Sequence, residues 1–309
     1  MRTKGWIALV AALITANSPA QKWPIEITPP PNINAYRKSG NESLLYRTRH
    51  FEIKTFKDHQ DRVLKTFVKC AESVPEVIQR LPIRLYAPPE RSPFQIQIHP
   101  DKDSYQSAGG AKGTAGFYES RKQTVLLQWD FLFDRNTPAG QIPKPNFDLV
   151  IHELTHLSMH SLIPRIEVWL SEGIAEYLVS AHVGDGRYRF DKIDTAIAKR
   201  IRSRHPKSTG TFTLPPLSEL LNASFRDWLA SSKGKSGDDV LEPYDASLLL
   251  VHYCFHGGEE RRKQTREYFQ HVHQNKPGRL LPVKGAPAIE KVLAAYWKKR
   301  GLKLLFRKP

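Results

Sequence analysis

The sequence predicts an α+β fold, in which an N-terminal mixed sheet with a long helix precedes a mainly helical C-terminal half. Apolar residues alternate in two short segments before residue 100, as in half-buried strands, and recur at helical spacing in most segments after residue 146. With 309 residues and 40% hydrophobic content, the chain can bury a sizeable core. We divide the chain into residues 1–20, a Pro-rich segment over 21–45 and a main domain over 46–309.

The first 20 residues have the composition of a secretory signal peptide. Arg2 and Lys4 precede an apolar run over residues 6–16, and Ser18, Pro19 and Ala20 end the segment as a cleavage site would. An uncleaved anchor is the alternative, but the run is shorter than the roughly 17–25 residues that span a bilayer. We therefore expect an exported protein, periplasmic or secreted. The prolines of residues 21–45 favour an extended tether.

The net charge restricts the possible binding partners, and the cysteine content restricts the possible disulfides. The formal charge of +16 is compatible with an anionic cell-surface or cell-wall polymer, or with a solvated basic surface. Residues 199–205 form a basic run, but an exported chain without a reading motif gives no reason to expect a specific nucleic-acid partner, and we interpret the run as a solvated helix face. Cys70 and Cys254 are the only cysteines and can form one disulfide or two buried thiols.

The α/β part is expected over residues 46–140. Strands are predicted at residues 51–53 and 94–98, with a helix around residues 63–71 between them. Glycines punctuate a turn over residues 109–116. Two further strand candidates follow at residues 114–118 and 124–129, and these can form a hairpin.

The helical part is expected over residues 141–309. It begins with Phe147, Val150, Ile151, Leu154 and Leu157, which share one stripe of a helix. Helical spacing recurs in five later segments, namely residues 168–179, 193–201, 244–255, 261–272 and 289–297. A surface loop is predicted at residues 231–239, which are rich in Ser, Gly and Lys.

The first of these helices carries a metal-binding motif, His152-Glu153-Leu154-Thr155-His156. Residues i and i+4 share a helix face, so both imidazoles can reach one ion. Zn²⁺ accepts imidazole nitrogen and carboxylate oxygen, and a catalytic site leaves its fourth position to water. Glu153 stands beside the first histidine, where its carboxylate can act as general base toward that water.

A third ligand follows in Trp169-Leu170-Ser171-Glu172-Gly173-Ile174-Ala175-Glu176-Tyr177. Pro164 allows the chain to turn, so that a second helix returns Glu172 to the histidines. Glu176 lies one turn later on the same face, where it can accept a hydrogen bond from a ligating histidine. His160 is expected to pack rather than to ligate. The three-histidine metal motif requires a glycine and a histidine where this chain has Met159 and Leu162.

Together these motifs resemble the gluzincin core of peptidase-MA-like domains, a group of zinc metallopeptidases that includes thermolysin-like and aminopeptidase-N-like enzymes and many exported bacterial proteins. The resemblance is specific over residues 147–180. It implies a zincin-like fold, with Glu172 as the third zinc ligand and Glu176 as the carboxylate that supports a ligating histidine.

Two weaker similarities add candidate residues. The glycine turn at residues 113–118 and the segment 124–127 resemble the turn and edge strand that precede the metal helix in this family. An edge strand can hold a peptide by main-chain hydrogen bonds, which makes Gly116, Val125 and Leu126 substrate-binding candidates. Residues 244–250 resemble the helix that carries a catalytic tyrosine in the aminopeptidase-like branch, which implies oxyanion stabilisation by Tyr244. No G-A-M-E-N element for a substrate amino terminus is present.

The sequence thus predicts an exported zinc peptidase that acts on a peptide or protein substrate. The alternative is a non-catalytic binding module on the same scaffold, with a basic surface that docks an anionic polymer. Tyr244 and the candidates on the strands can equally be packing residues.

Overall fold

The structure of the protein is a computed structural model, which describes residues 22–29, 36–39, 43–56, 61–88, 93–132, 146–160, 162–231, 238–276 and 278–308. The expected signal peptide at residues 1–20 and most of the predicted loop at 231–239 lie outside these residues. Among the described helices, none combines the length and the apolar character that crossing a membrane requires.

The described elements follow the predicted order, with the strands mostly in the N-terminal half. The strands are β1 (Glu26–Ile27), β2 (Tyr36–Ser39), β3 (Ser43–Arg47), β4 (Phe51–Phe56), β5 (Phe94–His99), β6 (Gly116–Glu119), β7 (Thr124–Gln128), β8 (Tyr188–Arg189), β9 (Thr211–Leu214) and β10 (Lys303–Phe306). The helices are α1 (Asp61–Arg80), α2 (Lys102–Ser107), α3 (Trp129–Leu132), α4 (Phe147–His160), α5 (Val168–Ala181), α6 (Ile193–Arg204), α7 (Leu217–Asn222), α8 (Phe225–Ser231), α9 (Asp238–His256), α10 (Glu259–His273), the 3₁₀ helix η1 (Val283–Gly285) and α11 (Ala286–Lys298).

Six strands form a mixed sheet in the order β2-β3-β4-β5-β7-β6. The pairs β4/β5 and β5/β7 are parallel, and the others are antiparallel. The long helix α1 provides the crossover between β4 and β5, and β6 and β7 form the predicted hairpin. These observations confirm the α+β class and the mixed sheet. They also make β6 one outer strand of the described sheet, beside α4.

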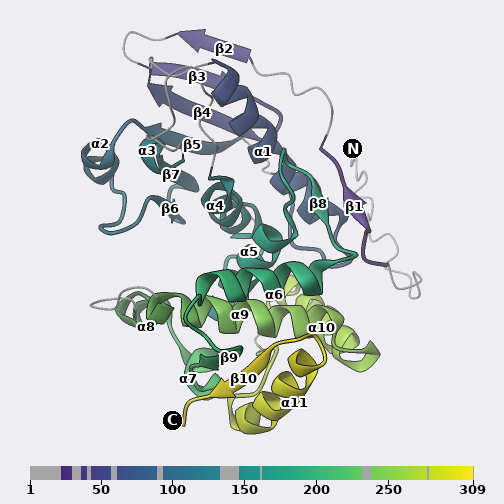
Figure 1. Cartoon of the computed structure of the whole chain (residues 1–309). Helices are drawn as coiled ribbons and strands as arrows, with labels where there is room; N and C mark the ends of the chain where they lie inside the picture. Colours follow the sequence, from purple (N-terminus) through teal and green to yellow (C-terminus); the bar gives the residue numbers. More distant parts are fainter. Residues whose placement is uncertain are drawn as a thin grey trace, which may run out of the picture.

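The helical half lies below the sheet in Figure 1, where α6 and α9 run across the molecule and α11 lies near the C-terminus. α4 contacts α1, α5, β6 and β7, and therefore connects the two halves. α5 packs on α9. A second, small sheet pairs β9 with β10 in parallel, although about ninety residues of chain separate these strands.

One continuous hydrophobic core unites the two halves. Its members include Phe67 and Val74 of α1, Leu154 of α4 and Leu249 of α9, all fully buried. Cys70 and Cys254 are both buried free thiols, so the alternative of a disulfide does not hold.

The N-terminal segment packs more closely than a tether would. β1 pairs with β8, and β2 and β3 extend the main sheet. The Trp23 ring lies 4.7 Å from His256 and 5.2 Å from Phe255, measured between centroids. An aromatic side chain buries a large apolar area, which explains why residues 22–29 lie on the helical half.

Candidate metal centre

α4 presents its two histidines on one face because His152 and His156 are one helical turn apart. The other faces of this helix are anchored in the core by Val150, Leu154 and Leu157, all fully buried. This packing fixes the helix and thereby the direction of both imidazoles. Their Nε2 atoms lie 3.1 Å apart.

α5 adds Glu172 to the pair. Its first turn is anchored by Trp169 and Leu170, which are buried in the core. Glu172 Oε2 lies 3.1 Å from His152 Nε2 and 3.5 Å from His156 Nε2. The structure therefore brings together the three predicted ligands, and we refer to these three side chains as the candidate metal-binding group of the described residues.

The spacing of these donors is close to that in a tetrahedral zinc site. Ligand atoms about 2.0–2.2 Å from a tetrahedral ion lie about 3.3–3.6 Å from each other. The three separations of 3.1, 3.1 and 3.5 Å are close to this range. Two imidazole nitrogens and one carboxylate oxygen are also a donor set that Zn²⁺ accepts. The residues present therefore fit a zinc ion.

The remaining nitrogens of both histidines have partners that fix their orientation. His152 Nδ1 lies 3.2 Å from Glu176 Oε1, and His156 Nδ1 lies 2.9 Å from Ser171 Oγ. With both Nδ1 atoms donating to these oxygens, each Nε2 keeps its lone pair for a metal ion. Glu176 thus lies where the sequence predicted. Ser171 is an additional contact that the sequence analysis did not identify.

Without a metal ion, His152 and Glu172 shift each other's pKa in opposite directions. Burial alone lowers the pKa of His152, but hydrogen bonds to Glu172 and Glu176 outweigh it and raise the pKa to about 10. Burial alone raises the pKa of Glu172, but His156 and His152 outweigh it and lower the pKa to about 2. Burial alone also raises the pKa of Glu176, but the hydrogen bond to His152 and the charges of Arg204 and Arg200 outweigh it and lower the pKa well below its ordinary value. Both carboxylates are therefore ionised, and their charge is available to a cation.

Glu153 lies beside the donor group. Burial raises the pKa of Glu153, although the neighbouring His152 and His156 oppose this shift. The backbone N–H of Tyr118 in β6 donates to its carboxylate. A Cβ atom on Gly116 would lie only 3.1 Å from Glu153 Cγ, so the absence of a side chain at Gly116 lets β6 approach this part of α4. A carboxylate with a raised pKa beside a metal site can act as general base.

Tyr244 reaches the same region from α9. Its ring centroid lies 6.1 Å from that of His152, and its hydroxyl accepts a hydrogen bond from the Trp228 indole. Burial, with the charge of Glu172, raises the pKa of Tyr244, so the phenol keeps its proton. The close approach of α9 to α5 occurs at Gly173, where a Cβ atom would lie 2.5 Å from the Ser247 carbonyl oxygen.

The predicted substrate-binding residues separate into two groups. Gly116 lies on the outer strand β6, but Val125 and Leu126 lie on β7, which pairs with β5 on one side and β6 on the other. Their backbone groups face strands that are already present, and both residues are buried. A peptide therefore cannot add to the sheet at Val125 or Leu126, and the prediction that they bind substrate through the main chain is wrong.

The structure also places His160 and the basic run at residues 199–205. His160 is not part of the metal-binding group, and its ring lies 5.1 Å from that of Tyr118. The basic run at residues 199–205 is a solvated face only in part. Arg200 and Arg204 point inward and bind Glu176, and Arg204 also binds Asp245. Their spacing of four residues was the available signal, because it places both beside the apolar stripe of α6.

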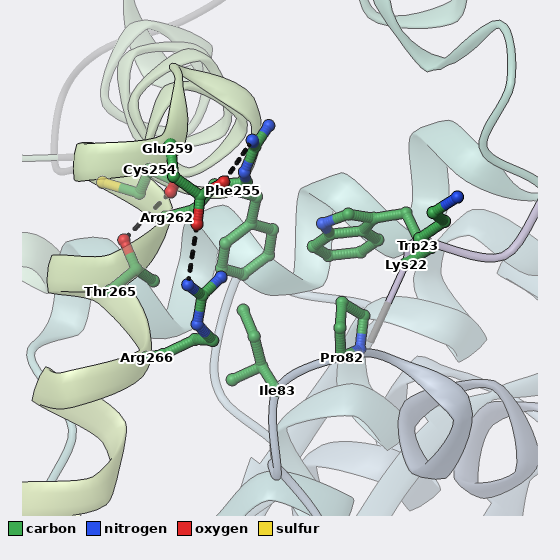
Figure 2. A pocket seen from close by; sticks show the side chains of 10 residues that line it. All are labelled: Lys22, Trp23, Pro82, Ile83, Cys254, Phe255, Glu259, Arg262, Thr265 and Arg266. Carbon is green, nitrogen blue, oxygen red and sulfur yellow. Dashed lines mark hydrogen bonds and ion pairs between the residues drawn. The ribbon is translucent and has the colours of Figure 1, made fainter. Parts of the chain in front are cut away.

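A separate cavity of about 340 Å³ lies between the N-terminal segment, α9 and α10 (Figure 2). Trp23, Ile83 and Phe255 provide apolar walls, and Glu259 pairs with Arg262 and Arg266 at 2.7 and 3.1 Å. None of its lining residues belongs to the metal-binding group.

Comparisons with models of protein families and with curated proteins find no match to this chain. The resemblance to gluzincins therefore rests on the motif residues and on their arrangement around one point.

Proposed function

We propose that this protein is a zinc-dependent peptidase of the gluzincin type with a zincin-like fold. His152, His156 and Glu172 would hold the metal, and Glu153 would act as general base. The convergence of three donor atoms within 3.1–3.5 Å of one another carries the proposal. Structural zinc sites usually have four protein ligands, whereas a three-ligand set leaves one position open.

Zinc, when bound, supplies Lewis-acid chemistry to a peptide carbonyl and to water. The protein residues move and hold protons. Glu153 takes a proton from the attacking water and returns it to the leaving amine. The raised pKa of Glu153 suits the first step, because a carboxylate with a higher pKa is a stronger base toward the water proton. It suits the second step as well, because a pKa nearer the operating pH still allows the proton to be given up. Tyr244 donates a hydrogen bond to the developing oxyanion from the α9 side.

The outer strand β6 is suited to hold the substrate chain. In an antiparallel pair, alternate residues direct both backbone groups at the partner strand. The Ala115 carbonyl accepts from Gln128, whereas the Tyr118 N–H turns to Glu153. Gly116 and Tyr118 therefore direct their backbone groups away from β7. A peptide laid along this side would pass next to Glu153, the proposed general base.

The alternative of a polymer-docking module was motivated by the basic charge of the chain. In residues 199–205, part of that charge is used internally, because Arg200, Arg204 and His205 bind carboxylates. The arrangement around Glu153 favours the peptidase proposal, since docking a polymer requires no general base beside a metal.

A peptide-library cleavage assay tests the proposal directly. The zinc content of the purified protein is measured first, and cleavage is then compared for wild type, Glu153→Gln and chelator-treated protein. We expect about one zinc ion per chain, and a loss of roughly 10²–10⁴-fold in the cleavage rate of Glu153→Gln with zinc retained. A wild-type protein that binds no zinc, or a Glu153→Gln variant that cleaves at the wild-type rate, would overturn it. Zinc binding without cleavage of any peptide would favour the docking module.

A further inference from the structure

The basic run of α6 contains side chains of two kinds. Lys199 and Arg202 are exposed, whereas the side chains of Arg200, Arg204 and His205 are only 19%, 14% and 11% exposed. A buried cation requires compensation. The inward group therefore needs partners inside the protein, and these partners lie next to the metal-binding group.

Arg204 lies between two buried carboxylates. It donates from Nη2 to Glu176 Oε2 at 2.6 Å and from Nη1 to Asp245 Oδ1 at 2.6 Å. The side chain of Glu176 is 6% exposed and that of Asp245 is fully buried. One guanidinium thus joins a carboxylate of α5 to a carboxylate of α9. Lysine could not reproduce this contact fully, because it lacks the planar fork of donors.

Each of the two carboxylates has a second cationic or histidine partner. Arg200 Nε donates to Glu176 Oε2 at 3.1 Å, and His205 Nε2 lies 2.6 Å from Asp245 Oδ2. If Arg204 were removed, two buried negative charges would lose their shared cation. Uncompensated buried charge is strongly unfavourable, so the carboxylates would move or hydrate.

The orientation of Glu176 affects the metal-binding group directly. Its other oxygen, Oε1, accepts from His152 Nδ1 at 3.2 Å. This contact holds the imidazole with Nε2 directed at Glu172 and His156. Arg204 thus restrains Oε2, and this leaves Oε1 in the position that His152 requires.

We propose that Arg204 is a positioning residue of the metal centre, which acts on zinc affinity through Glu176 while Asp245 holds its other arm. The inference rests on the proposed zinc site but does not depend on peptidase activity. It assigns a role to a residue that two others, Glu176 and His152, separate from the metal.

Zinc affinity of the metal-free protein, measured by competition with a chromophoric chelator, tests this role. Contacts behind a metal ligand typically contribute 10–100-fold to affinity, and we expect Arg204→Met to weaken zinc binding about tenfold. Arg204→Lys should recover part of this loss because it retains the charge. Lys199→Met is the matched control, since it removes an exposed positive charge from the same helix and should leave affinity unchanged.

A double-mutant cycle separates positioning from a general effect on folding. If Arg204 acts through Glu176, Arg204→Met should reduce zinc affinity in wild type but have little further effect in Glu176→Gln. Thermal unfolding of each metal-free variant is recorded in parallel. Should Arg204→Met not fold, the same cycle is run with Arg204→Lys, for which the expected loss is smaller.

Unchanged zinc affinity in the Arg204 variants would overturn the inference. So would an equal loss in the wild-type and Glu176→Gln backgrounds, because that result means an effect independent of Glu176. If the wild type binds zinc without cleaving peptides, the peptidase proposal fails while this test still stands. If the wild type binds no zinc, both proposals fail.

Discussion

Gly173 is the position at which α5 and α9 approach each other closely, and Gly173→Ala tests how tightly they pack. A Cβ atom there would lie 2.5 Å from the Ser247 carbonyl oxygen and 2.5 Å from Val251 Cγ2, whereas ordinary contacts begin at 3.4 Å. The helices would have to separate by about 0.9 Å to restore an ordinary contact, and the Ser247 oxygen belongs to the backbone.

Two opposing effects determine the change in the free energy of unfolding of Gly173→Ala. In an exposed helix, Gly→Ala stabilises a protein by roughly 1 kcal/mol. Overpacking a core costs about 1–3 kcal/mol. Because a backbone atom has to move by about 0.9 Å, we expect an overpacking cost near the upper end of this range. After subtraction of the helix-propensity gain, the free energy of unfolding should fall by about 2 kcal/mol. Since Glu172 is on α5 and Tyr244 on α9, a shift near 1 Å should also lower the proposed peptidase activity about 10²-fold.

Urea unfolding of wild type and Gly173→Ala measures the loss in the free energy of unfolding. Val251→Ala in the variant background is a useful control, because it removes the valine contact and leaves the carbonyl contact. Because Val251 is fully buried, Val251→Ala alone is the reference, and adding Gly173→Ala to it should lower the stability further. If Gly173→Ala is as stable as wild type, the helices do not pack as described and the reasoning is refuted.

Three further predictions concern the metal centre and the sheet. Tyr244→Phe should lower kcat about 10²–10³-fold and leave zinc affinity unchanged, as measured by steady-state kinetics and chelator competition. Free zinc at a thousandfold excess over its dissociation constant should stabilise the wild type by about 4 kcal/mol, and Glu172→Gln should remove most of this stabilisation in thermal unfolding. Glu72 is buried, which alone would raise its pKa, but hydrogen bonds from His50 and Thr48 hold the pKa below its ordinary value. A carboxyl group with a lower pKa in the folded chain stabilises the fold above its unfolded-state pKa, and this contribution disappears as the pH falls through the folded-state pKa. Glu72→Gln should therefore cost about 1.5–3 kcal/mol at pH 7 and much less at pH 3, as compared by urea unfolding at both pH values.

Local periodicity was sufficient to predict the elements that place the site. The stripe that begins at Phe147 predicted the helix that the structure has at Phe147–His160. The spacing within residues 152–156 and the return to Glu172 then brought the donors together as expected. Both inferences depend on helical geometry, which is the same wherever a helix lies in the fold.

Pairings between distant segments were not predictable. β9 and β10 form a parallel pair through residues 211–214 and 303–306, and neither segment carries a local signal for the other. β3 alternates buried Leu44 and Tyr46 with more exposed residues, but the prolines of the preceding segment led to its interpretation as a tether. Strand pairing is set by tertiary contacts, and a strand of four or five residues gives little periodicity to read.

The inward orientation of Arg200 and Arg204 shows a different limit. Ile193, Ile197 and Ile201 define the buried stripe of α6, and Arg204 follows Ile201 by three residues, on nearly the same face. This spacing places Arg204 beside the core, although the basic run was interpreted from the sequence as a solvated helix face. The carboxylates that bind it come from α5 and α9, and their positions depend on how the three helices pack.

The continuous core has a consequence for how such a chain can be divided. Fully buried side chains of α1 contact α4, and α4 in turn contacts α5. A break between residues 132 and 146 would therefore leave each fragment with a large apolar surface open to water, so that neither is an autonomous folding unit. The proposed metal ligands all lie on the C-terminal fragment, yet the outer strand β6 beside Glu153 comes from the N-terminal one. A recombinant chain that replaces only one fragment would therefore have to keep the core contacts between α1 and α4 and the contact of β6 with Glu153.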